Sequence, residues 1–345
     1  AGIPDRFHCR RPAAVGCGRT LAPYVAHPSG RLSVLPSQFD LAVLGADSPL
    51  AEAVLAILDE REVPIGRLFA LTLSEAEASA VFQGASWPHQ DAAGFDYSQA
   101  QALIVTSRGA AITRLLERIR AERPTMPILE ADAVDPSPAV IAARLIKPIA
   151  ALAGLVSAEA FVTLPVAVAG KEGVDELLQQ TRGLFNMESP EPEIFPLQIA
   201  FNLVPKTPGK NEPDYEALLA QATAKLANGV SVGFTAVTGP LFFGAAMAMH
   251  VRTARTLNIE MLRNALQHQD GITLMEAAEL ANTPAAMPTP ATDAQGSQDV
   301  FVGRIRIDGD VCRVWLVFDP ITLEAAQMAA GVENWIDKPA TSMLT

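Results

Sequence analysis

The first regular part of the chain shows a short apolar run followed by helical spacing. Residues 39–44, Phe-Asp-Leu-Ala-Val-Leu, form a run that stops at Gly45, as a buried strand does before a turn. Apolar positions then recur at intervals of three and four over residues 50–58, the spacing of one helix face. Ser48 suits the N-cap, and Pro49 suits the first helical position, where no backbone donor is needed. The pattern therefore predicts a strand, a turn and a helix.

A second unit repeats this order. The pattern predicts a strand over 102–106, a turn at Gly109, a helix over 112–122 and a further strand over 127–129. Strands that alternate with helices favour parallel pairing through right-handed crossovers. We therefore expect the α/β fold class, with a Rossmann-like domain of the dinucleotide-binding type over residues 38–136.

Beyond residue 136 several predicted strands follow one another without a helix between them. The predicted helices cover 138–155, 173–181, 215–227 and 259–267, and the predicted strands cover 160–168, 199–204, two segments within 230–251, 300–307 and 311–318. This order predicts an α+β domain over 137–320, with a mixed or antiparallel sheet and helices on one face. A final helix that starts at Leu323, within residues 321–345, is expected to return to the first domain.

Residues 1–37 differ from the rest of the chain in composition. They hold five arginines against one aspartate, together with five prolines and four glycines, so their charge is +4 against −16 for residues 38–345. The segment lacks the apolar core of a signal peptide. This composition is typical of a flexible basic tail, and a basic interaction arm is the alternative.

Charge and residue types disfavour several classes of function. A net charge of −12 offers no basic surface for nucleic acid or for an anionic membrane. The five histidines stand far apart, and Cys9, Cys17 and Cys312 show no close pairing. The spacing of a zinc site is therefore missing, and we expect no metal. So few cysteines favour a reducing, cytoplasmic location.

Residues 226–251 contain no charged side chain. The segment includes glycines and a proline, and residues 230–237 alternate as a half-buried strand does, so strands are favoured over a membrane span. Its apolar residues exceed what one sheet face needs to bury. This excess predicts a homodimer that pairs through the second domain.

Four segments carry a resemblance to a known family. They are Gly45 after the first strand, Gly-Val-Asp-Glu-Leu at 173–177, Ile-Ala-Phe-Asn-Leu-Val-Pro at 199–205 and, as the most specific, Asp-Val-Phe-Val-Gly-Arg-Ile-Arg at 299–306. With the order of elements, they resemble aspartate-semialdehyde dehydrogenases over about residues 38–330. Within that family the chain is most similar to the Usg proteins, bacterial relatives of the enzyme.

The resemblance implies a dimer formed by the second domain and a defined chemistry. In the family a cysteine forms a thioester, and acyl or hydride passes between aspartyl phosphate, the semialdehyde and NADP. Such a reaction needs a thiolate, a histidine that acts as acid and base, and cationic anchors for carboxylate and phosphate. It also needs a glycine-rich turn under the cofactor diphosphate.

The cofactor turn of the family, Gly-x-x-Gly-x-x-Gly, corresponds to residues 45–51, where only the first glycine is kept. Ser48 brings a side chain to the position of close approach, Pro49 removes a backbone donor, and Asp47 adds a negative charge. The resemblance thus places a vestigial cofactor site at Gly45, Ala46, Asp47, Ser48 and Leu50.

The family segment that holds the ribose phosphate of NADP corresponds to residues 70–76. Leu73 falls where an arginine is expected, and Glu75 adds charge of the wrong sign. We therefore expect weak or absent binding of NADP or NAD.

The catalytic positions of the family are also altered. Counted back from Lys147, the nucleophilic cysteine corresponds to Ser137, a weaker nucleophile that needs an adjacent base. The histidine position is Ala245, and the glutamine position is Leu164 or Pro165.

The substrate anchors of the family are only partly kept. Glu216 matches the family glutamate, but the lysine two residues later is Leu218. Arg108 is the one additional cation near the substrate loop, and an exposed helix-start arginine is its alternative interpretation.

Two hypotheses follow. The first is a dehydrogenase relative without activity that keeps a structural or regulatory role. The second is an active NAD(P)-dependent oxidoreductase on another carbonyl or acyl-phosphate substrate, with Ser137 or another residue in place of the cysteine. The joint change of nucleophile, base, anchors and cofactor turn favours the first.

Overall fold

The computed structural model describes residues 39–74, 78–188, 191–207, 214–275 and 287–337. The predicted basic tail and Glu75 lie outside these residues.

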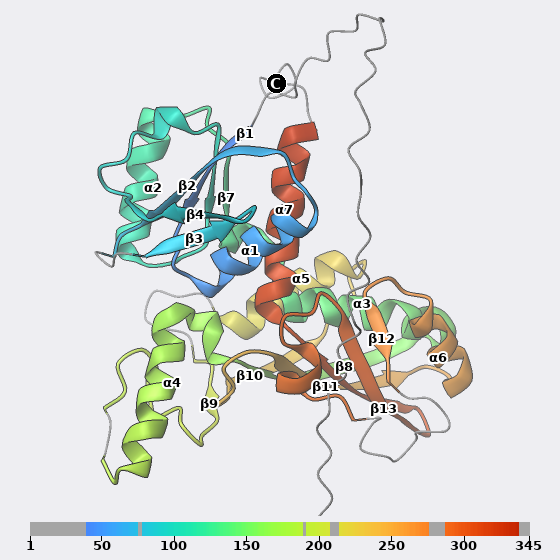
Figure 1. The fold of residues 1–345 in the computed structure, drawn as a ribbon. Helices are drawn as coiled ribbons and strands as arrows, with labels where there is room; N and C mark the ends of the chain where they lie inside the picture. Colours follow the sequence, from blue (N-terminus) through green and yellow to red (C-terminus); the bar gives the residue numbers. More distant parts are fainter. Residues whose placement is uncertain (1–38, 75–77, 189–190, 208–213, 276–286, 338–345) are drawn as a thin grey trace, which may run out of the picture. The chain divides into compact units, whose positions relative to one another are not determined.

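The first sheet is parallel and has five strands (Figure 1). They are β1 (Phe39–Leu44), β2 (Ile65–Thr72), β5 (Gln90–Asp91), β6 (Ala102–Val105) and β7 (Ile128–Glu130), in the order β5-β2-β1-β6-β7. Helix α1 (Pro49–Glu60) packs against one face of β1, and α2 (Ala110–Glu122) packs against the other. The predicted α/β fold class with a Rossmann-like parallel sheet is confirmed. A hairpin of β3 (Ser79–Phe82) and β4 (Ala85–Pro88) was not predicted.

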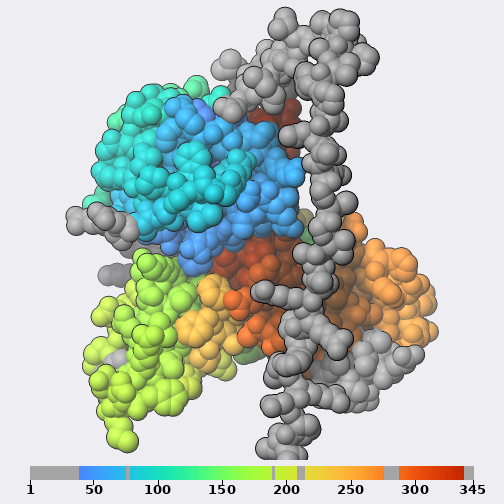
Figure 2. Space-filling model, viewed as in Figure 1, coloured from blue at the N-terminus to red at the C-terminus, as the bar shows by residue number. Residues whose placement is uncertain are grey.

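Helix α7 (Pro320–Asp337) shares a hydrophobic core with α1. Its Ile321, Ala325 and Met328 are buried in the same cluster as Leu41 of β1, and Figure 2 shows part of α7 (red) at the surface beside α1 (blue). Arg61 and Glu333 join the two helices by an ion pair of 3.2 Å. The apolar positions of the final helix therefore pack against the parallel sheet and its helix, whereas its sequence neighbours belong to the second sheet.

The second sheet is mixed and has seven strands. They are β8 (Leu155–Leu164), β9 (Val204–Pro205), β10 (Gly233–Thr238), β11 (Ala245–Thr253), β12 (Ile272–Leu274), β13 (Val300–Asp308) and β14 (Val311–Phe318), in the order β12-β13-β14-β11-β8-β10-β9. The pairs β8/β10 and β12/β13 are parallel and the other pairs are antiparallel. The predicted mixed sheet is therefore confirmed.

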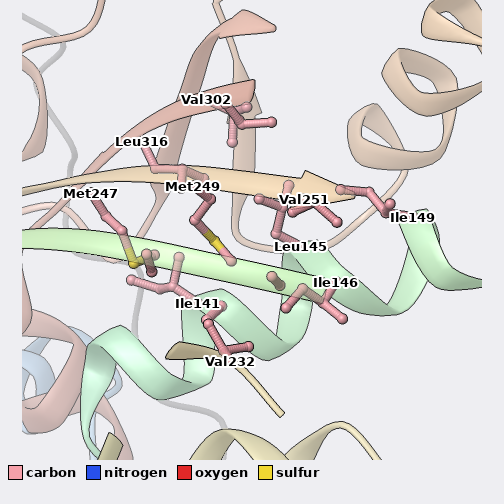
Figure 3. Packing of buried hydrophobic residues seen from close by; sticks show 14 of the residues in the cluster. Ile141, Leu145, Ile146, Ile149, Val232, Met247, Met249, Val251, Val302 and Leu316 are labelled. Atoms are coloured by element: carbon pink, nitrogen blue, oxygen red, sulfur yellow. The ribbon is translucent and has the colours of Figure 1, made fainter. Parts of the chain in front are cut away.

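Three helices pack against one face of this sheet: α3 (Ser137–Ala153), α5 (Tyr215–Leu226) and α6 (Ile259–Gln267). Figure 3 shows Ile141 and Leu145 of α3 packed against Met247 and Met249 of β11. These four side chains are at most 2% exposed. The apolar alternation of β11 thus builds one continuous core between sheet and helices. Helix α4 (Gly170–Phe185) lies outside this core.

One stretch, residues 131–153, is long and apolar enough to pass a length and composition test for a membrane-spanning helix. It contains α3, and 56% of its most apolar 18 residues are buried inside the protein. The uncharged stretch 226–251 forms a turn and the strands β10 and β11, as predicted.

The predicted strand over 199–204 is wrong except at its end. Only Val204–Pro205 pairs, as β9. The backbone N–H groups of Ile199 and Ala200 donate instead to the side-chain oxygen of Gln180, at 2.8 and 3.1 Å, and Phe201 has a positive φ of 59°. A buried glutamine from α4 therefore replaces the strand partner.

Several predicted boundaries also shift, and the helix expected over 173–181 runs over Gly170–Phe185. Strand β8 starts at Leu155 and ends at Leu164, before a short 3-10 turn over Val166–Ala169, so the expected strand over 160–168 is displaced. Helix α7 starts at Pro320 and not at Leu323, because the buried Asp319 carboxylate accepts the Ile321 N–H at 3.0 Å and caps the helix.

Candidate functional site

A cavity of about 170 Å³ lies at the carboxyl ends of β1 and β6. These two neighbouring strands continue into connections on opposite faces of the sheet, through α1 and α2. Open α/β sheets bind ligands at such a topological switch point. The cavity is lined there by Asp47 and Ser48 on one side and by Ser107 and Arg108 on the other. This is the candidate site of the first domain.

Gly45 brings the two loops of this site together. Its φ is +87°, and a Cβ atom at this position would lie 2.2 Å from Ser107 Oγ and 2.9 Å from the Ser107 backbone nitrogen. The N–H groups of Gly45 and Ala46 both donate to the Leu71 carbonyl, at 2.9 and 3.1 Å. The glycine therefore permits a tight turn that is held by the neighbouring strand.

Ser48 uses its side chain to close the start of α1. Its hydroxyl oxygen accepts the Ala51 N–H at 3.1 Å, as predicted for an N-cap, and its hydroxyl donates to Thr106 Oγ1 at 3.0 Å. The Thr106 hydroxyl lies 2.9 Å from the Gly45 carbonyl and 3.0 Å from that of Leu44. Ser48 and Thr106 are buried. The polar groups that close this turn are thus bonded to one another.

This turn does not fit a dinucleotide diphosphate. Binding requires free N–H groups at the helix start and an open approach of phosphate to the backbone. Here the Ser48 side chain already occupies the Ala51 donor, and Pro49 has none. Leu50 is buried in the core, and Asp47 lines the cavity with a carboxylate. Leu73, at the ribose-phosphate position, is 41% exposed and brings no positive charge.

Arg108 has a partner in the first domain. Its guanidinium donates to Asp132 at 2.6 Å, and both side chains are largely exposed. The cavity also receives Lys171 and Glu172 from the start of α4, and Glu324 from α7. Positive and negative side chains therefore alternate around a small volume.

Ser137 is fully buried at the start of α3. Its hydroxyl lies 3.0 Å from the Pro320 carbonyl and 3.3 Å from Glu324 Oε1. The single hydroxyl proton is thus directed toward α7. The arrangement fastens the first turn of α3 to the first turn of α7, and it leaves no exposed surface on the oxygen.

Glu324 is a carboxyl group in a partly buried position beside Ser137. Burial raises the pKa of Glu324 above its ordinary value, and the positive charge of Arg108 and the hydrogen bond from Ser137 oppose only part of this rise. A carboxyl with a raised pKa binds its proton more tightly in the folded chain than in the unfolded chain.

The Glu324→Gln variant is therefore expected to change the pH dependence of stability. The favourable contribution of the protonated carboxyl is complete below the unfolded pKa of about 4.3 and is lost as the pH rises through the higher folded pKa. Urea unfolding should give similar stability for variant and wild type at pH 4 and a more stable variant at pH 8. The exposed Glu117→Gln is the matched control. Equal wild-type and Glu324→Gln curves at pH 8 would contradict the burial argument.

The remaining predicted positions lie in the second domain and are occupied structurally. Ala245 is fully buried in the core between sheet and helices, as is Leu164. Glu216 Oε1 accepts the Ala236 N–H of β10 at 2.8 Å, whereas Leu218 is 39% exposed. Within the described residues no group of three or more potential ligands gathers as a metal site.

The sequence prediction missed Glu324, Asp132 and Lys171 at this site. Glu324 is the one acidic residue in the apolar segment 320–332, and that isolation is the one signal the sequence offered. No comparable sequence signal distinguishes Asp132 or Lys171 from other charged residues of the chain. Their place beside Arg108 and the turn depends on how the elements pack.

The comparisons with known proteins agree with this architecture. Residues 146–322, just over half of the chain, match the family model described as semialdehyde dehydrogenase, dimerisation domain. An aspartate-semialdehyde dehydrogenase 2 of Vibrio cholerae serotype O1 is 29% identical over 86% of this chain and 97% of its own length. A USG-1 protein homolog of Azotobacter vinelandii is 28% identical over 84% and 96%.

A solved structure extends the match to the whole described fold. The crystal structure of aspartate semialdehyde dehydrogenase II from Vibrio cholerae superposes with a TM-score of 0.71 at 27% identity, over 86% of this chain and 99% of that one. By its family match and by both sheets, the chain belongs to the semialdehyde dehydrogenase family.

Proposed function

We propose that this chain is a member of the semialdehyde dehydrogenase family without dehydrogenase activity, which acts as a structural or regulatory homodimer. The observation that carries the proposal is the state of Ser137. A nucleophile must present its oxygen to the substrate and pass its proton to a base. Ser137 is fully buried and hydrogen-bonded to α7 instead.

The second support is the loss of an acid and base at the histidine position. Ala245 has no titratable group, and it faces the core of the second domain. The family reaction needs a nucleophile and a base together. A substitute nucleophile would therefore also need a substitute base, because Ala245 cannot act as one. Glu216, the kept anchor, holds the backbone of β10.

The third support is the cofactor turn. This turn does not fit NADP or NAD. The Ser48 side chain occupies the Ala51 N–H, Pro49 has no N–H to donate, and Asp47 adds a negative charge. The family relation makes NADP the cofactor to test first.

One observation favours the second candidate function, an oxidoreductase with a different nucleophile. Glu324 Oε1 lies 3.3 Å from Ser137 Oγ, within reach of a base. Burial raises the pKa of the same carboxyl, and a raised pKa is common among carboxyl groups that act as general acids or bases. The burial of Ser137 makes this candidate the weaker one.

The decisive experiment uses phosphate-dependent oxidation of aspartate semialdehyde with NADP. Wild type is expected to stay at background, and Ser137→Cys is expected to stay there as well, because the new thiol would be buried and Ala245 supplies no acid or base at the histidine position. Calorimetric titration should give dissociation constants above about 1 mM for both NADP and NAD. The negative charge of Asp47 repels the diphosphate, and Pro49 has no backbone N–H to donate to it. Turnover in either protein, or micromolar cofactor affinity, would favour the oxidoreductase.

The homodimer is supported by the face of the second sheet that lies opposite α3, α5 and α6. Among the described residues, the segment 288–294 covers part of this face at β14 and β11, and the part around Phe161 is uncovered. Phe161 of β8 lies opposite Thr235 and Ala248, and Ala248 lies opposite Trp315. Phe161 is 41% exposed, although its neighbours in this row are mostly apolar. The next row holds the opposite charges of Glu159 and Arg313, on either side of His250. An apolar row flanked by mixed charges suits a self-complementary, two-fold interface.

A further inference from the structure

A second cavity, of about 460 Å³, lies between α3, α7 and two loops of the second domain. It shares no lining residue with the cavity at the Gly45 turn. Ser137, at the nucleophile position of the family, is among the residues that line this second cavity, although its side chain is fully buried. Ligand binding in the cavity does not require dehydrogenase activity. The cavity volume falls within the range of about 300–1,000 Å³ that small-molecule sites occupy.

The cavity contains an arginine and an aspartate that are not paired with each other. Arg144 of α3 and Asp270 both line it, and across the described part of the chain neither side chain takes part in an ion pair or hydrogen bond. The Arg144 guanidinium lies over Gly271, since a Cβ atom at Gly271 would be 3.0 Å from Arg144 Nη1. The Arg144 guanidinium thus lies beside the backbone that follows Asp270, and both charged residues are exposed.

The other charged groups of the cavity are already engaged. Arg61 donates to Glu333 at 3.2 Å and to Gln298 at 3.1 Å, and these bonds join the end of α1 to α7 and to the second domain. Asp299 accepts a hydrogen bond from Thr273 at 2.7 Å through one oxygen. Its carboxylate adds negative charge on the side of Asp270.

Aliphatic side chains also line the cavity. They are Leu323, Ala326 and Ala330 of α7 and Val140 and Ile141 of α3. Such a surface binds an aliphatic group through burial of apolar area. Within the described residues, the cavity therefore combines a group of aliphatic side chains with one cation and one carboxylate that have no partner.

We propose that this cavity binds a free α-amino acid with an aliphatic side chain. The ligand carboxylate would pair with Arg144, whose planar guanidinium suits a two-pronged contact. The ammonium group would lie against Asp270, with Asp299 behind it, and the side chain would pack on Leu323 and Ala330. A lone anion would satisfy Arg144 but would meet Asp270 with like charge, so a zwitterion is the class that both groups favour.

Calorimetry on the full chain tests the proposal with L-valine, L-leucine, L-isoleucine and L-methionine at concentrations up to about 10 mM. At least one is expected to bind with a dissociation constant below about 1 mM. The analogues 4-methylvalerate and isoamylamine each keep one charge of leucine, and each should bind at least about 10-fold more weakly, the factor expected from loss of one charged contact. No binding by any of the four amino acids, or equal binding of 4-methylvalerate, would overturn the proposal.

Three variants locate the site. Arg144→Met and Asp270→Asn should each weaken binding by about 10-fold or more, and Ala330→Leu should block it by filling the aliphatic part of the cavity while both charges remain. Arg114→Met, an exposed arginine on α2, is the matched control and should bind as wild type. Circular dichroism and thermal unfolding establish that each variant is folded. Binding that persists unchanged in both Arg144→Met and Ala330→Leu would place the ligand elsewhere and refute the assignment.

Discussion

Gly45→Ala is expected to lower the free energy of unfolding by about 2–5 kcal/mol. About 1–2 kcal/mol arises because an L-residue is disfavoured at a φ of +87°. A further 1–3 kcal/mol, roughly the cost of overpacking, arises because the new Cβ would meet Ser107, including its backbone nitrogen at 2.9 Å. Urea unfolding followed by circular dichroism measures the change.

A matched glycine separates the two causes. Gly84 has a φ of +70° and no atom within 4 Å of its ideal Cβ position, so Gly84→Ala should cost only the backbone strain of about 1 kcal/mol. In a double-mutant cycle, Ser107→Gly should recover part of the loss in Gly45→Ala and give a coupling of about 1 kcal/mol. Equal losses at both glycines, with no coupling to Ser107, would show that close approach of the two loops is not what Gly45 provides.

Local signals predict the parts of this fold that local forces determine. Helix α6 and strand β14 have the predicted boundaries, because Asn258 caps the helix through the Glu260 and Met261 N–H groups and because the alternation of β14 matches a half-buried strand. Ser48 was likewise predicted as a cap and acts as one. Each of these features depends on residues a few positions apart.

Features that depend on distant partners were not predictable in this way. The apolar run at 199–204 reads as a strand, but Gln180 takes its backbone donors. Ser137 and Glu324 are 187 residues apart in sequence, so no pattern along the chain reveals that they meet. The charged residues of the second cavity could not be predicted from the sequence pattern either. Arg144 and Asp270 line the same cavity only because α3 packs beside the loop at Gly271.

The same reasoning links the buried serine to the stability of the fold. Ser137 and Asp319 fix the first turns of α3 and α7 to each other and to the loop at Gly296. A reactive residue at position 137 would need exposure to substrate, whereas a structural residue gains from burial and full hydrogen bonding. The geometry supports the structural role, which is why loss of activity and retention of the fold are proposed together.

Phe161→Glu is expected to convert the homodimer to a monomer. The carboxylate would lie in the centre of the apolar row formed with Thr235, Ala248 and Trp315, and burial of an unpaired charge at an interface centre is strongly unfavourable. We expect the dimer dissociation constant to rise by about 100-fold or more, about 2.8 kcal/mol. Sedimentation velocity across a range of concentrations measures this change.

A second variant tests whether any added charge has the same effect. Val81 of β3 is 72% exposed and lies outside the second sheet, so Val81→Glu should sediment as a dimer like the wild type. Phe161→Glu should keep the wild-type circular dichroism spectrum, because Phe161 is 41% exposed in the protomer and its replacement removes little from the core. A wild-type species of 36.5 kDa at micromolar concentration, or a Phe161→Glu protein that remains dimeric, would show that the uncovered sheet face is not the dimer interface.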